Sequence, residues 1–481
     1  MIAIRAFCAT VIFASCGVAQ AQPIALHPDN PHYYVFRGKP TVLVSSTEHY
    51  GAVINSGFDY RKYLDTLAAD GLNLTRTFAG TYRENPGSFN ISKNTLAPEA
   101  NHFVSPWMRS RTMGAADGLN KWDLNAWNPA FFARLKDFVS EAGKRGIIVE
   151  LTLFCTFYDE KLWANSPLNG INNVQAIGTG LTHEQPFTLK DPHLQDVQDQ
   201  LVRRIADTLR DADNVIYEIC NEPYFGGVTL EWQKHIATVL SDSESKSGRR
   251  HLTAQNIANN QQKVTDGNPK VSEFNFHYAR PPIAVEENYA LNKVIGFDET
   301  GFDGTADFVY RIEGWDFLFA GGAHYDNLDY SFTAGHEDGT YGYPGSQPGG
   351  GSTTLRKQLG ALLLFFKRLD FTHMRPDPSV IDGGPPQTAS AHVLANSGRE
   401  YAIYIHHGEV RPKYSPSYAV ENAKHTIELK LAIPDGVYVA TWWDPKSGKE
   451  MEAGDVTAAG GRAGFRSPEY KEDIAVQVRR K

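Results

Sequence analysis

The sequence predicts a (β/α)8 TIM barrel followed by a small C-terminal β-sandwich domain. Short apolar runs alternate with stretches of helical period over most of the 481 residues, which indicates repeated strand–helix–strand units and a parallel sheet. Two of these runs end in a glutamate, Glu222 and Glu299, 77 residues apart. At roughly 25 to 30 residues per strand-plus-helix unit, that spacing suits the fourth and seventh strands of a barrel.

The first expected element is a hairpin, residues 33–36 followed by 37–40, that closes the bottom of the barrel. Helices between the strands carry ordinary signals: Asn128-Pro129, for example, caps a helix that ends before Gly146. The eight expected strands are 41–46, 72–78, 147–154, 215–220, 251–255, 273–277, 294–297 and 323–326.

After about Arg375 the pattern changes to short alternating strands, at 401–406, 425–431, 438–443 and 474–478. We therefore divide the chain into a signal peptide at 1–21, a barrel with its N-terminal hairpin at 22–375, and a β-sandwich at 376–481. The sandwich could bind carbohydrate or brace the barrel. Bracing is favoured because Trp442 and Trp443 are adjacent in one strand, so at least one must face a core.

The composition and charge of the chain limit the kinds of partner that it is expected to bind. The net charge is −8, and the sequence holds no concentrated run of Lys or Arg. No nucleic-acid partner is expected, since phosphates require a basic patch. Aromatic residues make up 12% of the chain, which suits a surface that stacks against sugars.

The first 21 residues read as a cleavable secretory signal, with Arg5, an apolar stretch and Ala19-Gln20-Ala21 at the cleavage site. A lipoprotein box ending at Cys16 is the less favoured alternative, because Phe13 is atypical there. No other segment approaches the roughly 18 apolar residues that span a bilayer. We expect a secreted or periplasmic protein without a membrane span.

Two cysteines, Cys155 and Cys220, remain after the signal. Each ends an apolar strand, and neighbouring parallel strands rarely present the geometry of a disulfide, so two free thiols are favoured over a pair. Their spacing suits no zinc site. No metal and no organic cofactor is expected.

The candidate catalytic residues are Glu222 and Glu299. The apolar run 215–220 stops at Asn221-Glu222-Pro223, because proline cannot continue a central strand. A second acid, Glu299, ends the run 294–297 in a similar setting. In a parallel barrel the loops after the strands build the site, and two carboxyl groups are what cleavage of a glycosidic bond requires.

These residues resemble the large clan of retaining glycoside hydrolases typified by family 5. The resemblance covers most of residues 40–375 and rests on four motifs in order. The C-terminal segment 442–448 looks like the small β domain of some apiosidase-like members. The four motifs are Asn73-Leu74-Thr75-Arg76, Tyr217-Glu218-Ile219-Cys220-Asn221-Glu222-Pro223, Phe276-His277-Tyr278 and Asp298-Glu299-Thr300-Gly301.

The resemblance implies that Glu222 is the general acid/base and Glu299 the nucleophile. Asn221 would then bond the sugar 2-hydroxyl. Arg76 would hold the nucleophile ionised by opposite charge, or be a structural ion-pair partner instead. His277 and Tyr278 would orient the nucleophile and close the subsite of the cleaved sugar, although His277 could also be a satisfied core histidine.

Two further acids near the motifs are assigned no catalytic role. Glu218 lies four residues before Glu222, hence on the same face but deeper in the barrel. The side chain of Asp298 is expected to point away from that of Glu299.

Substrate contacts are also expected on strands one and eight. His49 is the candidate on the first. Family 5 members usually offer a tryptophan on the eighth, but residues 323–330 contain none. His324 and Asn327 would replace that stacking with hydrogen bonds, which would suit a sugar other than those of cellulose and mannan.

The leading hypothesis is a secreted retaining β-glycosidase that acts by double displacement on a plant or microbial carbohydrate. A transglycosylase would share all of these residues, and a non-catalytic carbohydrate-binding protein is the alternative from another class. Two long loops, 79–123 and 333–354, are candidate walls of the substrate cleft. The sequence leaves open the sugar, the linkage and endo or exo action.

Overall fold

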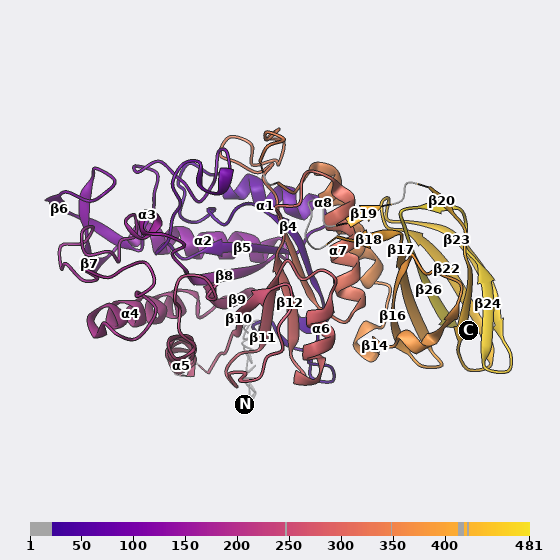
Figure 1. Ribbon diagram of the computed structural model, residues 1–481. Helices are drawn as coiled ribbons and strands as arrows, with labels where there is room; N and C mark the ends of the chain where they lie inside the picture. The colour runs from indigo at the N-terminus through magenta and orange to yellow at the C-terminus, as the bar shows by residue number, and fades with distance from the viewer. Residues whose placement is uncertain (1–21, 246–247, 348, 412–417, 421–422) are drawn as a thin grey trace, which may run out of the picture.

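The computed structural model describes residues 22–245, 248–347, 349–411, 418–420 and 423–481. The expected signal peptide lies outside the described residues. A barrel of strands and helices occupies one side of the molecule, and a strand-rich C-terminal region lies beside it (Figure 1). Within the described residues no helix has the length and apolar character needed to cross a membrane.

The barrel is a parallel sheet of eight strands in the order β4-β13-β12-β11-β10-β9-β8-β5. The strands at the two ends of that order meet through Asn73, whose amide nitrogen donates to the Val42 carbonyl at 2.8 Å and whose amide oxygen accepts from the Val44 nitrogen at 2.9 Å. All eight expected strands are present. Their bounds are β4 Leu43–Thr47, β5 Leu74–Phe78, β8 Ile148–Cys155, β9 Val215–Asn221, β10 Leu252–Asn259, β11 Glu273–His277, β12 Val294–Glu299 and β13 His324–Leu328.

Helices cover the outside of the barrel (Figure 1). As expected, Asn128 caps α2: its side chain accepts from the Ala130 nitrogen, and Pro129 takes the first helical position. The helices are α1 Tyr60–Ala69, α2 Pro129–Lys144, α3 Glu160–Trp163, α4 Pro192–Leu209, α5 Leu230–Ser245, α6 Ile283–Asn288, α7 Asp307–Phe319 and α8 Thr353–Phe366.

An N-terminal sheet closes the end of the barrel where the strands begin. It consists of β1 Ala25–Leu26, β2 Tyr34–Phe36 and β3 Lys39–Thr41. The Tyr34 hydroxyl donates to Glu273 at 2.6 Å, at the first residue of β11. A side chain of the hairpin therefore reaches into the barrel interior, as a plug would.

The C-terminal region contains a six-stranded sheet, β14-β16-β17-β26-β22-β23, and a three-stranded sheet, β15-β21-β24. Apolar side chains of both sheets form one core, so the region is a β-sandwich. The strands are β14 Arg375–Pro376, β15 Ile381–Gly383, β16 Ser390–Asn396, β17 Glu400–His406, β21 Glu428–Ala432, β22 Gly436–Asp444, β23 Lys449–Ala458, β24 Arg462–Arg466 and β26 Asp473–Arg480, with the short pairs β18 Gly408–Val410 with β19 Tyr418–Val420 and β20 Lys424–His425 with β25 Tyr470–Lys471.

The sandwich packs directly on the barrel helices. Trp442 faces the sandwich core, whereas Trp443 packs against Phe365 of α8 with ring centroids 5.8 Å apart. On α7, the buried Arg311 contacts Asp473 of β26 at 2.9 Å. Both tryptophans are buried, which favours a bracing role for this domain.

Candidate active site

A cavity of about 280 Å³ opens at the carboxyl ends of the barrel strands. Glu222 and Glu299 both line it, together with Asn221, Tyr278 and His49. This is the rim where loops after the strands build sites in such barrels. The two candidate catalytic acids therefore share one cavity at the expected end of the fold.

Glu299 is the last residue of β12, and four side chains hold its carboxylate. Its Oε2 accepts from the Tyr50 hydroxyl at 2.9 Å and from Arg76 at 3.2 Å, and its Oε1 accepts from the Tyr278 hydroxyl at 3.1 Å. Burial would raise the pKa of Glu299, but the charges of His277 and Arg76, with hydrogen bonds from His277 and Tyr50, hold it well below its usual range. These contacts therefore favour the ionised form of Glu299.

Glu222 follows directly on Asn221, the last residue of β9. The Tyr158 hydroxyl donates to its Oε2 at 2.5 Å, and the Tyr224 hydroxyl donates to its Oε1 at 3.3 Å. His277 Nδ1 lies 3.2 Å from the same Oε1. These contacts fix the carboxyl group while leaving Glu222 on the cavity wall.

His277 lies between the two acids. Its Nδ1 is 3.2 Å from Glu222 and 3.3 Å from Glu299, and one carboxylate oxygen of each acid lies within 4.8 Å of the other. Two carboxyl groups about 5 to 5.5 Å apart are typical of attack by one of them on the sugar, whereas a site that places water between them needs about 6.5 Å or more. An approach this close between two oxygens is compatible with the shorter separation.

Arg76 lies beneath both acids and is fully buried. It donates to Glu218 at 2.6 Å and to the Asn221 amide oxygen at 2.7 Å, besides its bond to Glu299. Because Arg76 holds that oxygen, the Asn221 amide nitrogen faces the Tyr158 hydroxyl, at 3.0 Å. Glu218 is the buried interior acid that its position predicted.

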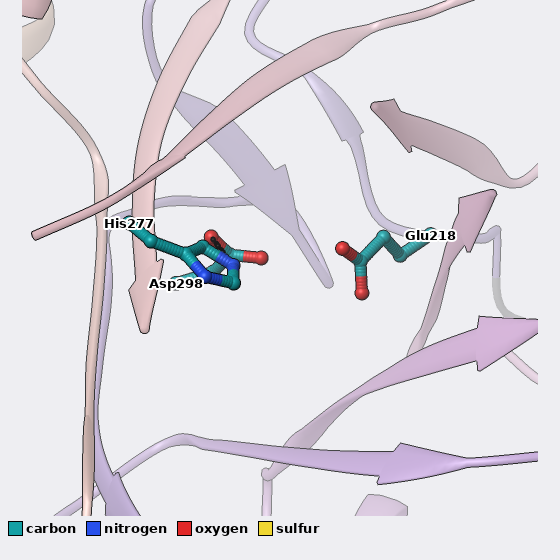
Figure 2. A group of neighbouring side chains, drawn as sticks. All are labelled: Glu218, His277 and Asp298. Atoms are coloured by element: carbon teal, nitrogen blue, oxygen red, sulfur yellow. Dashed lines mark ion pairs between the residues drawn. The ribbon is translucent and has the colours of Figure 1, made fainter. Parts of the chain in front are cut away.

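Asp298 does not point away from Glu299, which corrects the expectation from strand alternation. The pairing of β11 with β12 shifts register immediately before His277, which pairs with Glu299. This irregularity lets two consecutive acids face the barrel interior. Figure 2 shows the His277 imidazole against the Asp298 carboxylate, 3.5 Å from Nε2 to Oδ1, with Glu218 pointing toward them from the opposite side.

Two groups of side chains have the composition of metal ligands: Glu218, His277 and Asp298, and Glu222, His277 and Glu299. Both include His277. Burial would lower its pKa, but the charges of Glu299 and Asp298 and hydrogen bonds to Glu222 and Glu299 raise it well above the usual value. A protonated imidazole and the Arg76 guanidinium therefore already supply positive charge to these carboxylates.

The remaining expected contacts divide into two sets. His49 lines the cavity, and its Nε2 lies 3.3 Å from Glu84. His324 is fully buried deeper in the barrel, 2.7 Å from Glu273, and the buried Asn327 donates to the Leu328 carbonyl at 3.0 Å. Neither residue lines the cavity. His324 turns into the barrel interior, whereas the Asn327 amide lies against Gly350 in the loop after β13.

Several contacts of the site were missed from the sequence. Tyr50, Tyr158 and Tyr224 each hold a candidate acid, and each comes three residues after the last residue of its strand, β4, β8 or β9. A tyrosine three residues after the end of a strand is therefore the sequence signal that could have identified these contacts. Tyr50, Glu222 and Tyr278 also have positive φ, at 59°, 46° and 51°. Such backbone costs about 1 to 3 kcal/mol each for non-glycine residues and is concentrated at functional sites.

The two long loops contribute differently. Residues 79–123 supply Tyr82, Glu84, Phe89 and Leu96 to the cavity, but Trp107 is buried in a hairpin that the sequence did not predict, β6 Trp107–Met113 with β7 Asn120–Trp127. No described residue of 333–354 lines the cavity. That loop instead contacts the first loop, for example at Asn90 with Ser346, 2.7 Å, and at Ser92 with Gln347, 2.7 Å.

Comparison with known proteins supports the fold. A family model described as "Domain of unknown function (DUF6298)" matches residues 95–272. No curated protein matches the chain. Among solved structures, one named "Glycoside hydrolase" is 13% identical, covers 96% of this chain and 97% of its own, and has a TM-score of 0.65. A glycoside hydrolase family 5 protein from Bacteroides vulgatus ATCC 8482 is also 13% identical, with coverages of 95% and 94% and a TM-score of 0.62.

Proposed function

We propose that this protein is a retaining glycoside hydrolase, with Glu222 as general acid/base and Glu299 as nucleophile. The observation that carries the proposal is the pair of carboxyl groups on one rim cavity, with one oxygen of each within 4.8 Å of the other. The resemblance in fold to solved glycoside hydrolases supports the same class. Arg5 and the small-residue pattern Ala19-Gln20-Ala21 support export to the periplasm or medium.

In the first step, the Glu299 carboxylate attacks the anomeric carbon while the Glu222 carboxyl gives its proton to the departing oxygen. The bond from that carbon to the leaving group breaks as a glycosyl ester forms on Glu299. In the second step, Glu222 takes a proton from water, and the water oxygen displaces Glu299 from the same carbon. Two inversions return the starting configuration.

The surroundings of the two acids differ in charge. Arg76 and His277 keep the Glu299 carboxylate negative, as a nucleophile requires. Glu222 contacts the neutral hydroxyls of Tyr158 and Tyr224 and shares only His277 with the nucleophile. The Asn221 amide, oriented by Arg76, lies on the cavity wall where it can bond a sugar hydroxyl.

The test compares wild type, Glu299→Gln and Glu400→Gln on a broad panel of glycans and aryl glycosides, with released sugars measured. Glu400 is a matched control, a buried and hydrogen-bonded glutamate in the sandwich. We expect cleavage by wild type and by Glu400→Gln, and none by Glu299→Gln. Equal cleavage by all three proteins would contradict the assignment of Glu299.

A further inference from the structure

Two phenylalanines at the mouth of the cavity are unusual for their exposure. Phe89 is 40% and Phe225 is 45% exposed, and no other Phe, Tyr or Trp among the described residues is as open to solvent. Both line the cavity. An open aromatic surface beside a cavity marks a place where a ligand covers it.

Both rings pack on Tyr158, with centroids 5.2 Å away for Phe89 and 6.1 Å for Phe225. Tyr158 in turn holds Glu222 through its hydroxyl. The three rings come from three separate loops, after β5, β8 and β9. They form a platform on the Glu222 side of the cavity, which we call the Phe89–Phe225 platform.

The backbone conformation at Phe89 indicates that its ring is held in a fixed position. Its φ is 52°, and the next residue, Asn90, has a φ of 59°. A bulky residue in this region is strained, and such strain persists only where the surroundings enforce it. The bond from Asn90 to the Ser346 carbonyl is one such constraint. The ring of Phe89 is therefore held open at the mouth by its loop.

We propose that the Phe89–Phe225 platform binds the leaving group of the substrate through its apolar ring surfaces. This inference rests on the proposed function. A nucleophile displaces its leaving group from the opposite side, so the group attached to carbon opposite Glu299 departs toward Glu222 and the rings packed beside it. Phenylalanine offers no hydrogen bond, so the platform selects shape and apolar surface: the face of an aryl aglycone or the C–H face of a sugar ring.

The test uses Phe89→Ala/Phe225→Ala and the control Leu364→Ala, an exposed apolar side chain on α8. Three substrates share the glycosyl group that wild type cleaves: an aryl glycoside, an oligosaccharide and the glycosyl fluoride, whose leaving group is too small to cover the rings. Removing two half-exposed rings is expected to lower kcat/KM roughly tenfold more for a ring-bearing substrate than for the fluoride. Leu364→Ala should match wild type on all three.

The substrate with the larger loss of kcat/KM identifies the natural leaving group. A larger loss for the aryl glycoside indicates an aromatic leaving group, and a larger loss for the oligosaccharide indicates a sugar. Equal losses on all three substrates would overturn the platform and leave the glycosidase standing. Failure of wild type to release sugar from any substrate would overturn the proposed function itself.

Discussion

Replacing Arg76 by Met should destabilise the fold more than any exposed arginine would, because Arg76 is fully buried among carboxylates. Its guanidinium lies 2.6 Å from Glu218, 3.2 Å from Glu299, 3.5 Å from Asp298 and 3.6 Å from Glu150. Methionine fills much of the same volume but leaves these acids without their shared cation. Removing one partner of a buried ion pair costs about 3 to 5 kcal/mol.

A second substitution separates lost charge from lost packing. In Arg76→Met/Glu218→Gln the acid that is closest to Arg76 is neutral, so the double variant should recover part of the free energy of unfolding. Arg210→Met is the control: Arg210 pairs with Asp207 at the surface, at 3.4 Å, and exposed pairs contribute about 0 to 1 kcal/mol.

The measurement is the free energy of unfolding in urea at neutral pH, followed by tryptophan fluorescence. A loss of less than about 1 kcal/mol in Arg76→Met would refute the reasoning, because a buried cation shared by several acids cannot be that dispensable. A double variant no more stable than Arg76→Met would show that packing, and not uncompensated charge, sets the cost.

Three further predictions concern catalysis and the sandwich. Glu222→Ala should slow the cleavage of substrates with poor leaving groups by about 10² to 10⁴-fold, because these leaving groups need a proton from Glu222. Aryl glycosides with acidic leaving groups should be slowed much less. An equal loss for the two kinds of substrate would contradict the role of Glu222 as acid. Asp298→Asn removes a negative charge that helps raise the pKa of His277 against the opposing effect of burial, so the imidazole should lose its proton at lower pH than in wild type. NMR titration of the His277 ring checks this, and an unmoved titration would contradict the coupling. Trp443→Ala should lower the free energy of unfolding by about 3 to 5 kcal/mol and leave KM for a soluble glycan unchanged. A raised KM with unchanged stability would instead indicate a sugar-binding domain.

The eight barrel strands could be predicted because short runs rich in apolar residues recur between turns and helices, although β11 and β13 are more polar than the others. Their ends placed Glu222, Glu299 and Asn221 at one rim, since parallel strands share a direction. Strand alternation failed only at Asp298, where the register shift between β11 and β12 breaks the period of two.

The rest of the site depends on loop conformation, which the periodicity of apolar residues in the sequence does not predict. Tyr158 reaches Glu222 from the loop after β8, and Phe89 reaches the cavity from a loop held by Ser346, 257 positions further along the chain. His324 was expected at the rim but begins β13, so it lies below the cavity. For these residues the sequence indicates the chemical groups that they offer, but only the folded structure shows where those groups lie.

The most direct test of the central claim is to trap the glycosyl group on the protein. A 2-deoxy-2-fluoro glycoside of the cleaved sugar with a good leaving group slows the second step, so the ester should accumulate and be found by peptide mass spectrometry. The account predicts one added glycosyl group, carried by Glu299. A label on another residue, or turnover without a label and with inverted product, would contradict it.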